Sequence, residues 1–217
     1  TFLDQVLIST EPDTFMRSRN VQFQAGGLRP VARFYPFMDG IAGIDVVPKL
    51  LEVSMVSGTF NVGEKVEGFV GSEKLITFRT AQPDHKDGPY NAPTITYNAN
   101  PYNTSESFST QYSASGTTLN VDTRSLSANA QGTYFGYVTT GMSLVGADSG
   151  ATATVTDVRL VADTFGDLIG TFFIRDPNTS PPPTVRIKTG DRTFRVSTSI
   201  SDAEQLPGSL IISHGEG

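Results

Sequence analysis

Cysteine and tryptophan are both absent from this chain of 217 residues. Without cysteine the chain can form no disulfide, no thiolate metal site and no cysteine nucleophile, so packing, hydrogen bonding or assembly must stabilise it. Histidine is scarce as well, since His85 and His214 are the only two. Neither lies in sequence that offers the buried partners of a Ser-His-Asp triad.

Charge is also scarce. Charged residues make up 18% of the chain, against roughly 25% in ordinary soluble domains. The formal net charge is -6. Binding to nucleic acid requires a basic surface, so no nucleic-acid partner is expected. Long apolar runs are missing too. Because a membrane-spanning helix needs about 18 or more apolar residues in a row, no membrane span is predicted.

The sequence does carry apolar residues that alternate with polar ones, a period of two that is typical of strands. Pairs of Gly, Pro, Asn and Asp, which are typical of turns, separate the alternating stretches. Strands are predicted at 21–24 and 31–38 and further strands near 51–57, 65–70, 75–80, 118–122, 133–138, 152–161, 168–174, 184–188, 193–198 and 209–213. Only 46–52 has a faint helical pattern. Short strands at this spacing predict an all-β fold, an antiparallel sandwich or small barrel units with a long irregular arm. The alternation also predicts five core residues: Phe34, Val66, Leu144, Val155 and Phe173.

A short motif occurs twice. "VGEKVEG" at 62–68 and "TGMSLVG" at 140–146 share Gly-x-x-Val/Leu-x-Gly, and each follows a Gly-Thr-aromatic start. As a true repeat, the copies would mark two barrels that resemble SH3 domains, with glycines opening tight turns and the aliphatic residue in the core. The predicted organisation is therefore an N-terminal β segment (1–57), a first barrel-like unit (58–131) with an arm at 78–116, and a second barrel-like unit with the C-terminal strands (132–217).

The stretch "GGLRPVARF" places Leu28, Pro30 and Phe34 at the spacing of the Leu-x-Pro-x-x-x-Tyr corner. In this it resembles fibronectin type III and immunoglobulin-like sandwiches, although Phe34 has no hydroxyl. Four arginines surround the stretch: Arg17, Arg19, Arg29 and Arg33. They are candidate interface residues. One interpretation is a patch for an acidic partner; the other is a set of edge-strand charges that prevent unwanted pairing or cross a subunit interface.

The arm at 78–116 is rich in Tyr, Asn, Pro and Ser. Loops longer than about 12 to 15 residues in compact domains are usually functional or form interfaces. Four tyrosines in the arm are candidate interface residues: Tyr90, Tyr97, Tyr102 and Tyr112. Tyrosine and asparagine are also suited to stacking on sugars and hydrogen bonding to them, so a host surface glycan is the alternative partner.

Residues for catalysis or metal binding are few. Four aspartates lie in or beside predicted turns, where capping explains them: Asp39, Asp45, Asp163 and Asp167. The D-x-[DN]-x-[DN]-G calcium loop is absent. Neither glycine motif precedes a helix or a Lys-Ser/Thr pair, so neither is a phosphate loop. The chain is therefore predicted not to be an enzyme and to have no catalytic residues, cofactor or metal.

Several ordered blocks resemble one group of proteins. The blocks are "FMRSRNVQFQAGGLRPVARFYPFMDGIAGIDV", "AQPDHKDGPYNAPTITYNANPY", "YSASGTTLNVDTRSLS", "SGATATVTDVRLVADTFGDLIGTFFIRDPN" and "TGDRTFRVSTS". They follow one another as in virion structural proteins of tailed phages, notably cyanophages and other marine phages, over roughly residues 14 to 200. Such relatives are associated with tail fibres or baseplates.

The resemblance implies a structural component of a phage particle, linked to the tail fibre or baseplate. Its expected partners are copies of itself and neighbouring virion proteins, and its expected location is the virion. Repeated symmetric contacts would supply the stability that disulfides give other extracellular proteins. Two alternatives stay open at this point: a capsid decoration or head-fibre protein, and a carbohydrate-binding adhesin.

Overall fold

The computed structural model describes residues 15–81, 118–128, 132–162, 166–202 and 214–216. These residues form strands and one short helix, and all strand pairs are antiparallel. The elements are β1 (Arg19–Ala25), β2 (Arg33–Met38), β3 (Ile41–Ala42), β4 (Val46–Pro48), β5 (Leu50–Ser57), β6 (Lys65–Val70), β7 (Glu73–Arg79), β8 (Thr118–Asn120), α1 (Thr123–Ala128), β9 (Phe135–Gly136), β10 (Ser143–Gly146), β11 (Thr152–Asp157), β12 (Leu160–Val161), β13 (Leu168–Ile174), β14 (Phe194–Ser197) and β15 (His214–Glu216). The prediction of an all-β, antiparallel fold is confirmed.

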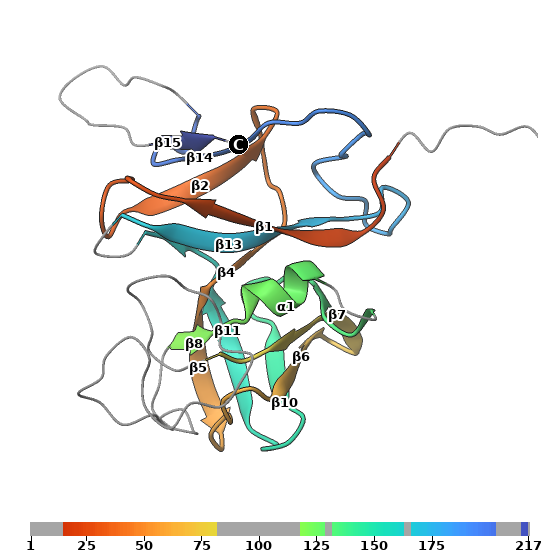
Figure 1. Ribbon diagram of the computed structural model, residues 1–217. Coiled ribbons are helices and arrows are strands. Elements are labelled where there is room, and N and C mark those ends of the chain that lie inside the picture. The colour runs from red at the N-terminus through yellow and green to blue at the C-terminus, as the bar shows by residue number, and fades with distance from the viewer. Residues whose placement is uncertain (1–14, 82–117, 129–131, 163–165, 203–213, 217) are drawn as a thin grey trace, which may run out of the picture.

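Two units make up the described structure, one nested inside the other along the chain (Figure 1). The outer unit holds β1 to β4 and β12 to β15, and the inserted unit holds β5 to β11 with α1. The chain enters the inserted unit at Lys49 and returns through 158–159. The two crossings are neighbours because β5 pairs with β11, with Glu52 opposite Asp157. Arg159 holds them together through ion pairs to both carboxylates.

The outer unit is a sandwich of two sheets. One sheet has the order β1-β13-β4, and the other has the order β12-β2-β14-β15 with β3 paired to β2. Their apolar faces meet in one core, where the rings of Phe172 and Phe194 stack with centroids 4.7 Å apart. Phe34 lies in this core with 1% of its surface exposed, so its alternation with polar neighbours did indicate its burial.

The inserted unit is a seven-stranded sheet, β8-β5-β11-β10-β6-β7-β9, curled into a half-barrel around a second core. Val66, Leu144 and Val155 are all buried in it. Helix α1 lies between this sheet and the outer unit, in contact with β1, β13 and β7 (Figure 1). Phe173, on β13, is 8% exposed. All five predicted core residues are therefore buried.

The two glycine motifs lie side by side in this one sheet. Strands β6 and β10 pair so that Gly68 faces Leu144 and Val66 faces Gly146. Gly68 thus accommodates Leu144 of the other copy, whereas Gly146 lies against the side chains of Glu64 and Ser149. A Cβ on Gly68 would come within 2.5 Å of Ile76 and Met142, so close packing requires glycine there. The first glycines of the motifs do open turns, since both have positive φ: 82° at Gly63 and 84° at Gly141.

The strand predictions hold for most of the chain, but the strands β3 and β10 were not predicted. The segment 184–188 forms no strand and has only a bridge from Phe15 to Lys188. The faint helical pattern at 46–52 was wrong, because β4 and β5 occupy it. All three residues of β4 are buried, so its apolar residues do not alternate with polar ones. The helix α1 was not predicted. The predicted strand at 209–213 lies outside the described residues.

The sheets do not follow the predicted segments 1–57, 58–131 and 132–217. The seven-stranded sheet takes β5 from the first, β6 to β8 from the second and β9 to β11 from the third. Strands that are far apart in the sequence thus belong to the same sheet. The likeness to immunoglobulin, fibronectin or SH3 folds in particular stays a prediction.

Candidate functional site

The four candidate arginines are exposed but do not form one patch. Arg17 and Arg19 lie at the start of β1, whereas Arg29 and Arg33 follow its end. Six steps of about 3.3 Å along β1 separate the two pairs by roughly 20 Å. The Arg33 guanidinium stacks 5.2 Å from the Tyr35 ring centre. The four predicted arginines therefore form two separate pairs, one near each end of β1. The four arm tyrosines (Tyr90, Tyr97, Tyr102 and Tyr112) lie outside the described residues.

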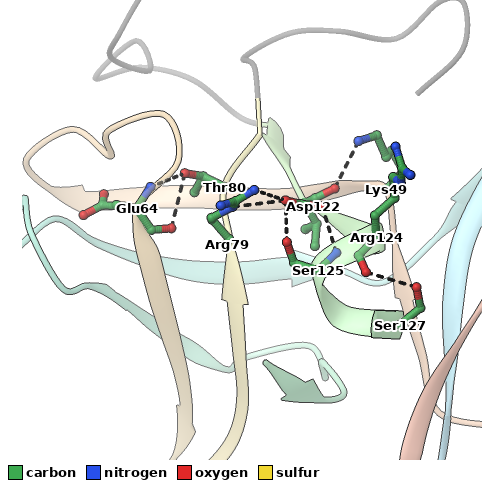
Figure 2. Close-up of polar contacts among 9 residues, drawn as sticks. Lys49, Glu64, Arg79, Thr80, Asp122, Arg124, Ser125 and Ser127 are labelled. Atoms are coloured by element: carbon green, nitrogen blue, oxygen red, sulfur yellow. Dashed lines mark hydrogen bonds and ion pairs between the residues drawn. The ribbon is translucent and has the colours of Figure 1, made fainter. Parts of the chain in front are cut away.

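A cluster of polar residues marks the crossing between the units (Figure 2). Lys49 joins β4 to β5 and is 4% exposed. Its Nζ donates a hydrogen bond to the carbonyl oxygen of Val121 at 3.1 Å, and the Val121 N–H donates to the Lys49 carbonyl at 2.8 Å. Burial lowers the pKa of Lys49 to about 8, although nearby Asp122 acts in the opposite direction. Lys49 is thus a buried amine held against the backbone that leads into α1.

Asp122 is the second member of the cluster and is fully buried. It precedes the first residue of α1, and its Oδ1 accepts the Ser125 N–H at 3.0 Å, the bond of an N-cap. Its Oδ2 accepts bonds from the Ser125 hydroxyl at 2.6 Å and from Arg79 at 2.7 and 3.1 Å. One carboxylate therefore caps the helix and ties it to β7 (Figure 2).

A lysine with a lowered pKa can serve as a base or nucleophile. Lys49 lacks the accessibility that such chemistry needs, since its amine is buried and bonded to a backbone carbonyl. The cleft described below is not lined by Lys49. The geometry gives Lys49 and Asp122 a structural role, which is to fix the inserted unit where the chain enters it.

Glu64 performs a similar task at the start of β6. Its Oε1 accepts the Asn61 N–H at 2.8 Å and the Ser149 hydroxyl at 2.7 Å, and its Oε2 accepts the N–H groups of Asp148 at 3.1 Å and Ser149 at 2.9 Å. The Glu64 N–H donates to Thr80 Oγ1 at 3.1 Å (Figure 2). This carboxylate closes the β10 to β11 turn rather than offering a ligand site.

Two further contacts connect the units. The fully buried amide of Asn20, on β1, donates to the Gly136 carbonyl at 2.8 Å and accepts the Gly136 N–H at 2.9 Å. The side chain therefore acts as a backbone-like partner for β9. Arg175 donates to the Tyr137 hydroxyl at 3.1 Å and pairs with Asp45 at 3.4 Å. Burial raises the pKa of Asp45, and the Arg175 charge opposes the rise.

An apolar cleft of about 530 Å³ lies at one side of the outer sandwich. Its walls include Met16, Val21, Phe23, Met38, Phe172 and Phe194. The ring centres of Phe23 and Phe194 lie 4.7 Å apart. Four polar residues also line it: Gln22, Gln24, Asp191 and Arg192. Arg192 pairs with Asp39 at 3.2 Å. A cleft of this size and character can take apolar side chains or a small apolar molecule.

The turn aspartates have structural partners where they are described. Asp39 accepts the Thr193 N–H at 3.0 Å as well as the Arg192 bond, and Asp45 has Arg175. Asp163 lies outside the described residues, and so does His85. Across 15–81, 118–128, 132–162, 166–202 and 214–216, no three His, Cys, Asp or Glu side chains gather in a way that could hold a metal ion.

Sequence reasoning missed Lys49, Asp122 and Asn20. Two of them did leave signals: Lys49 interrupts the apolar run "VVPKLLEV", and Asp122 with Ser125 has the spacing of a helix N-cap. Asn20 left none, because its partner Gly136 is 116 positions away.

Comparison with protein-family models, curated proteins and solved structures found no match to this chain. Among the described residues, no helix has the length and apolar character that crossing a membrane would require.

Proposed function

We propose that this chain is a structural component of a tailed-phage particle, linked to the tail fibre or baseplate, that works through symmetric contacts between copies and with neighbouring virion proteins. It acts in the virion, carries no cofactor and catalyses no reaction. The main support is the ordered set of sequence blocks that resemble virion proteins of marine phages.

The described parts of these blocks meet in space, which supports their being one folded module. The block at 15–46 supplies β1 to β3 and begins β4, the block at 149–178 supplies β11 to β13, and the block at 189–199 supplies β14. Across them β1 pairs with β13, and β2 pairs with β12 and β14. The buried residues Asn20, Glu64 and Asp122 bond to side chains and backbone of the fold itself.

The test has two measurements. Light scattering coupled to size-exclusion chromatography on the recombinant chain should give a multiple of its 23.3 kDa mass. Mass spectrometry and immunogold labelling of purified virions from a phage that encodes the chain should find it on the tail. A stable monomer that is absent from those virions would overturn the proposal, and labelling on the head would move it to the capsid.

A further inference from the structure

Four basic side chains gather where the chain enters β1. There the Met16 N–H donates to the carbonyl of Ile187 at 3.1 Å, and Phe15 forms an antiparallel bridge with Lys188 (Figure 1). Residues 15–16 therefore lie beside residues 187–188. The basic residues on and next to this contact are all exposed. We call them the basic corner: Arg17, Arg19, Arg186 and Lys188.

The members of the basic corner are close in space. Arg17 and Arg186 each adjoin one residue of the hydrogen-bonded pair. The Cα atoms of hydrogen-bonded antiparallel partners are about 5.5 Å apart and each step along a chain adds about 3.8 Å, so the Cα atoms of Arg17 and Arg186 lie within about 13 Å of each other. The same reasoning places Lys188 within about 13 Å of Arg17, and Arg19 follows Arg17 after one intervening residue. The four charges can therefore reach one extended ligand.

The basic corner also differs from the rest of the molecule in its lack of ion pairs. Among the lysines and arginines that the structure describes, those without an ion pair, a side-chain hydrogen bond or a ring contact are the members of the basic corner and Arg124. Two acids lie on the neighbouring segments, Asp176 and Asp191, and neither forms an ion pair with these cations. The Asp176 carboxylate instead accepts the Asn178 N–H at 2.8 Å. Nearly all of the unpaired positive charge in the described chain is thus concentrated at one place, where it creates a positive potential.

The open setting of the basic corner indicates the kind of anion that suits it. All four side chains are exposed, and none of them lines the apolar cleft. Because water and salt screen exposed ion pairs, one small anion would be held only weakly there. A polymer that carries negative charges along its length binds several cations at once, and its affinity rises accordingly.

The surroundings of the basic corner favour a hydrophilic polymer over a protein. Protein interfaces are centred on apolar or aromatic anchor residues. The exposed large apolar residues of the described structure are Val31, Ile41, Val56, Val70, Phe135, Val161 and Ile200. None of them belongs to 15–19 or to 186–188. Nucleic acid fits less well than an uncharged sugar backbone with acidic groups, because the chain as a whole has a net charge of -6.

We propose that the basic corner binds an acidic polysaccharide. Its arginines donate charge-assisted hydrogen bonds to carboxylate or sulfate groups of the polymer, because the planar guanidinium matches these oxyanions. Lys188 adds a further positive charge at the same place. This site goes beyond the proposed structural role and does not depend on it. On the tail of a phage it would contact acidic polymers of a cell surface.

The test is isothermal titration calorimetry of the full chain at about 0.15 M NaCl, a physiological ionic strength. The probes are dextran sulfate and polygalacturonate, and uncharged dextran is the control polymer. At least one acidic polymer should bind, and dextran should not. The double substitution Arg17→Gln with Arg186→Gln should weaken binding at least tenfold, because it removes two of the four contacts. Arg124→Gln is the matched control: it removes an exposed, unpaired arginine on α1 and should leave binding within about twofold.

Circular dichroism should show both variants to be folded, since the substituted side chains are exposed; Arg17→Lys with Arg186→Lys keeps the charge and should lose less affinity than the glutamine pair. Three results would each overturn the site: no binding of either acidic polymer, an equal loss on Arg124→Gln, or tighter binding of double-stranded DNA than of both polymers. The fate of the proposed function is read separately. A chain that binds these polymers but occurs in no virion would remove the phage role and keep the site, whereas a virion protein that binds neither would do the reverse.

Discussion

Phe60, Phe78 and Met142 have no exposed surface in the inserted unit, whereas Phe172 and Phe194 of the outer unit each keep 9% and border an open cleft. The difference follows from the two ways of building a core from sheets. A half-barrel curls around its own side chains. A two-layer sandwich has open sides, which must be covered by loops, by another segment or by another chain. The inserted unit thus has the more fully enclosed core, although Val47 of β4 belongs to it, and the outer unit has the open cleft.

The largest expected effect comes from removing a ring at the closed side of the outer core. Phe34→Ala should lower the free energy of unfolding by about 3 to 5 kcal/mol, because Phe34 is 1% exposed and the space it leaves cannot collapse fully. Phe23→Ala, at the cleft, should cost less than half as much. Urea unfolding monitored by circular dichroism measures both. Equal losses would mean that the cleft is as well packed as the rest of the sandwich.

A second substitution breaks the polar tie at the edge of the inserted unit. Asp122→Ala should cost about 3 kcal/mol, because it leaves the Arg79 guanidinium without its 2.7 Å partner and α1 without its cap. Asp122→Asn is the control, since asparagine keeps one oxygen that can cap the helix but loses the charge and the second acceptor oxygen. Denaturant unfolding of both variants divides the loss between ion pair and cap. If Asp122→Ala changes stability by less than 1 kcal/mol, the cluster does not anchor the helix.

Lys49 makes stability depend on pH. Its folded pKa of about 8 lies below its ordinary value of 10.5, so between these values the unfolded chain holds a proton that the folded chain has released. Stability should therefore rise with pH in this window, by roughly 2 to 3 kcal/mol at pH 10. Lys49→Met should remove this rise and change stability little at neutral pH. Denaturation midpoints from pH 7 to 10 for both proteins supply the comparison; parallel curves would contradict the lowered pKa.

The smallest expected effect concerns the contact between the two units. Asn20→Ala leaves the N–H and C=O of Gly136 without their side-chain partner, at a cost of about 2 kcal/mol. The loss should appear as faster hydrogen exchange at β9 and α1, with β6 and β10 unaffected. Gln22→Ala, which removes one bond of 3.2 Å to Thr123, is the matched control and should cost less. Uniformly faster exchange would show that the units unfold as one.

Sequence patterns predicted the local part of this fold better than its long-range part. Strands such as β6 and β13 show in the alternation or density of apolar residues, and Val66 and Leu144 were identified as core residues from their motif. The motif itself could not reveal that its copies pair with each other, because pairing depends on the whole path of the chain. The same holds for Asn20 and Gly136, whose mutual fit exists only after β1 and β9 have been brought together.

The candidate site was less predictable than the fold. Arginines around Gly26 and Gly27 are near one another in sequence, yet β1 carries two of them to its start and leaves the others beyond its end. Each residue of a strand adds about 3.3 Å to its length, so residues at the two ends of a long strand lie far apart. The cleft could not be foreseen either, because Phe23, Phe172 and Phe194 come from three distant strands and only the packing of the two sheets makes them neighbours.

The nested path of the chain also determines the order in which the two units can form during synthesis. The inserted unit, 50–157, is one continuous stretch, so all of its strands are available before β12 to β15 of the outer unit have been synthesised. Strand β2 ends at Met38 and pairs with β14, which starts at Phe194, a gap of 194 − 38 = 156 residues. At about 5 to 20 residues per second, β2 must wait roughly 8 to 30 seconds for this neighbour. The outer unit is therefore the last to form, and its apolar strands are the part of the nascent chain that most needs protection by a chaperone.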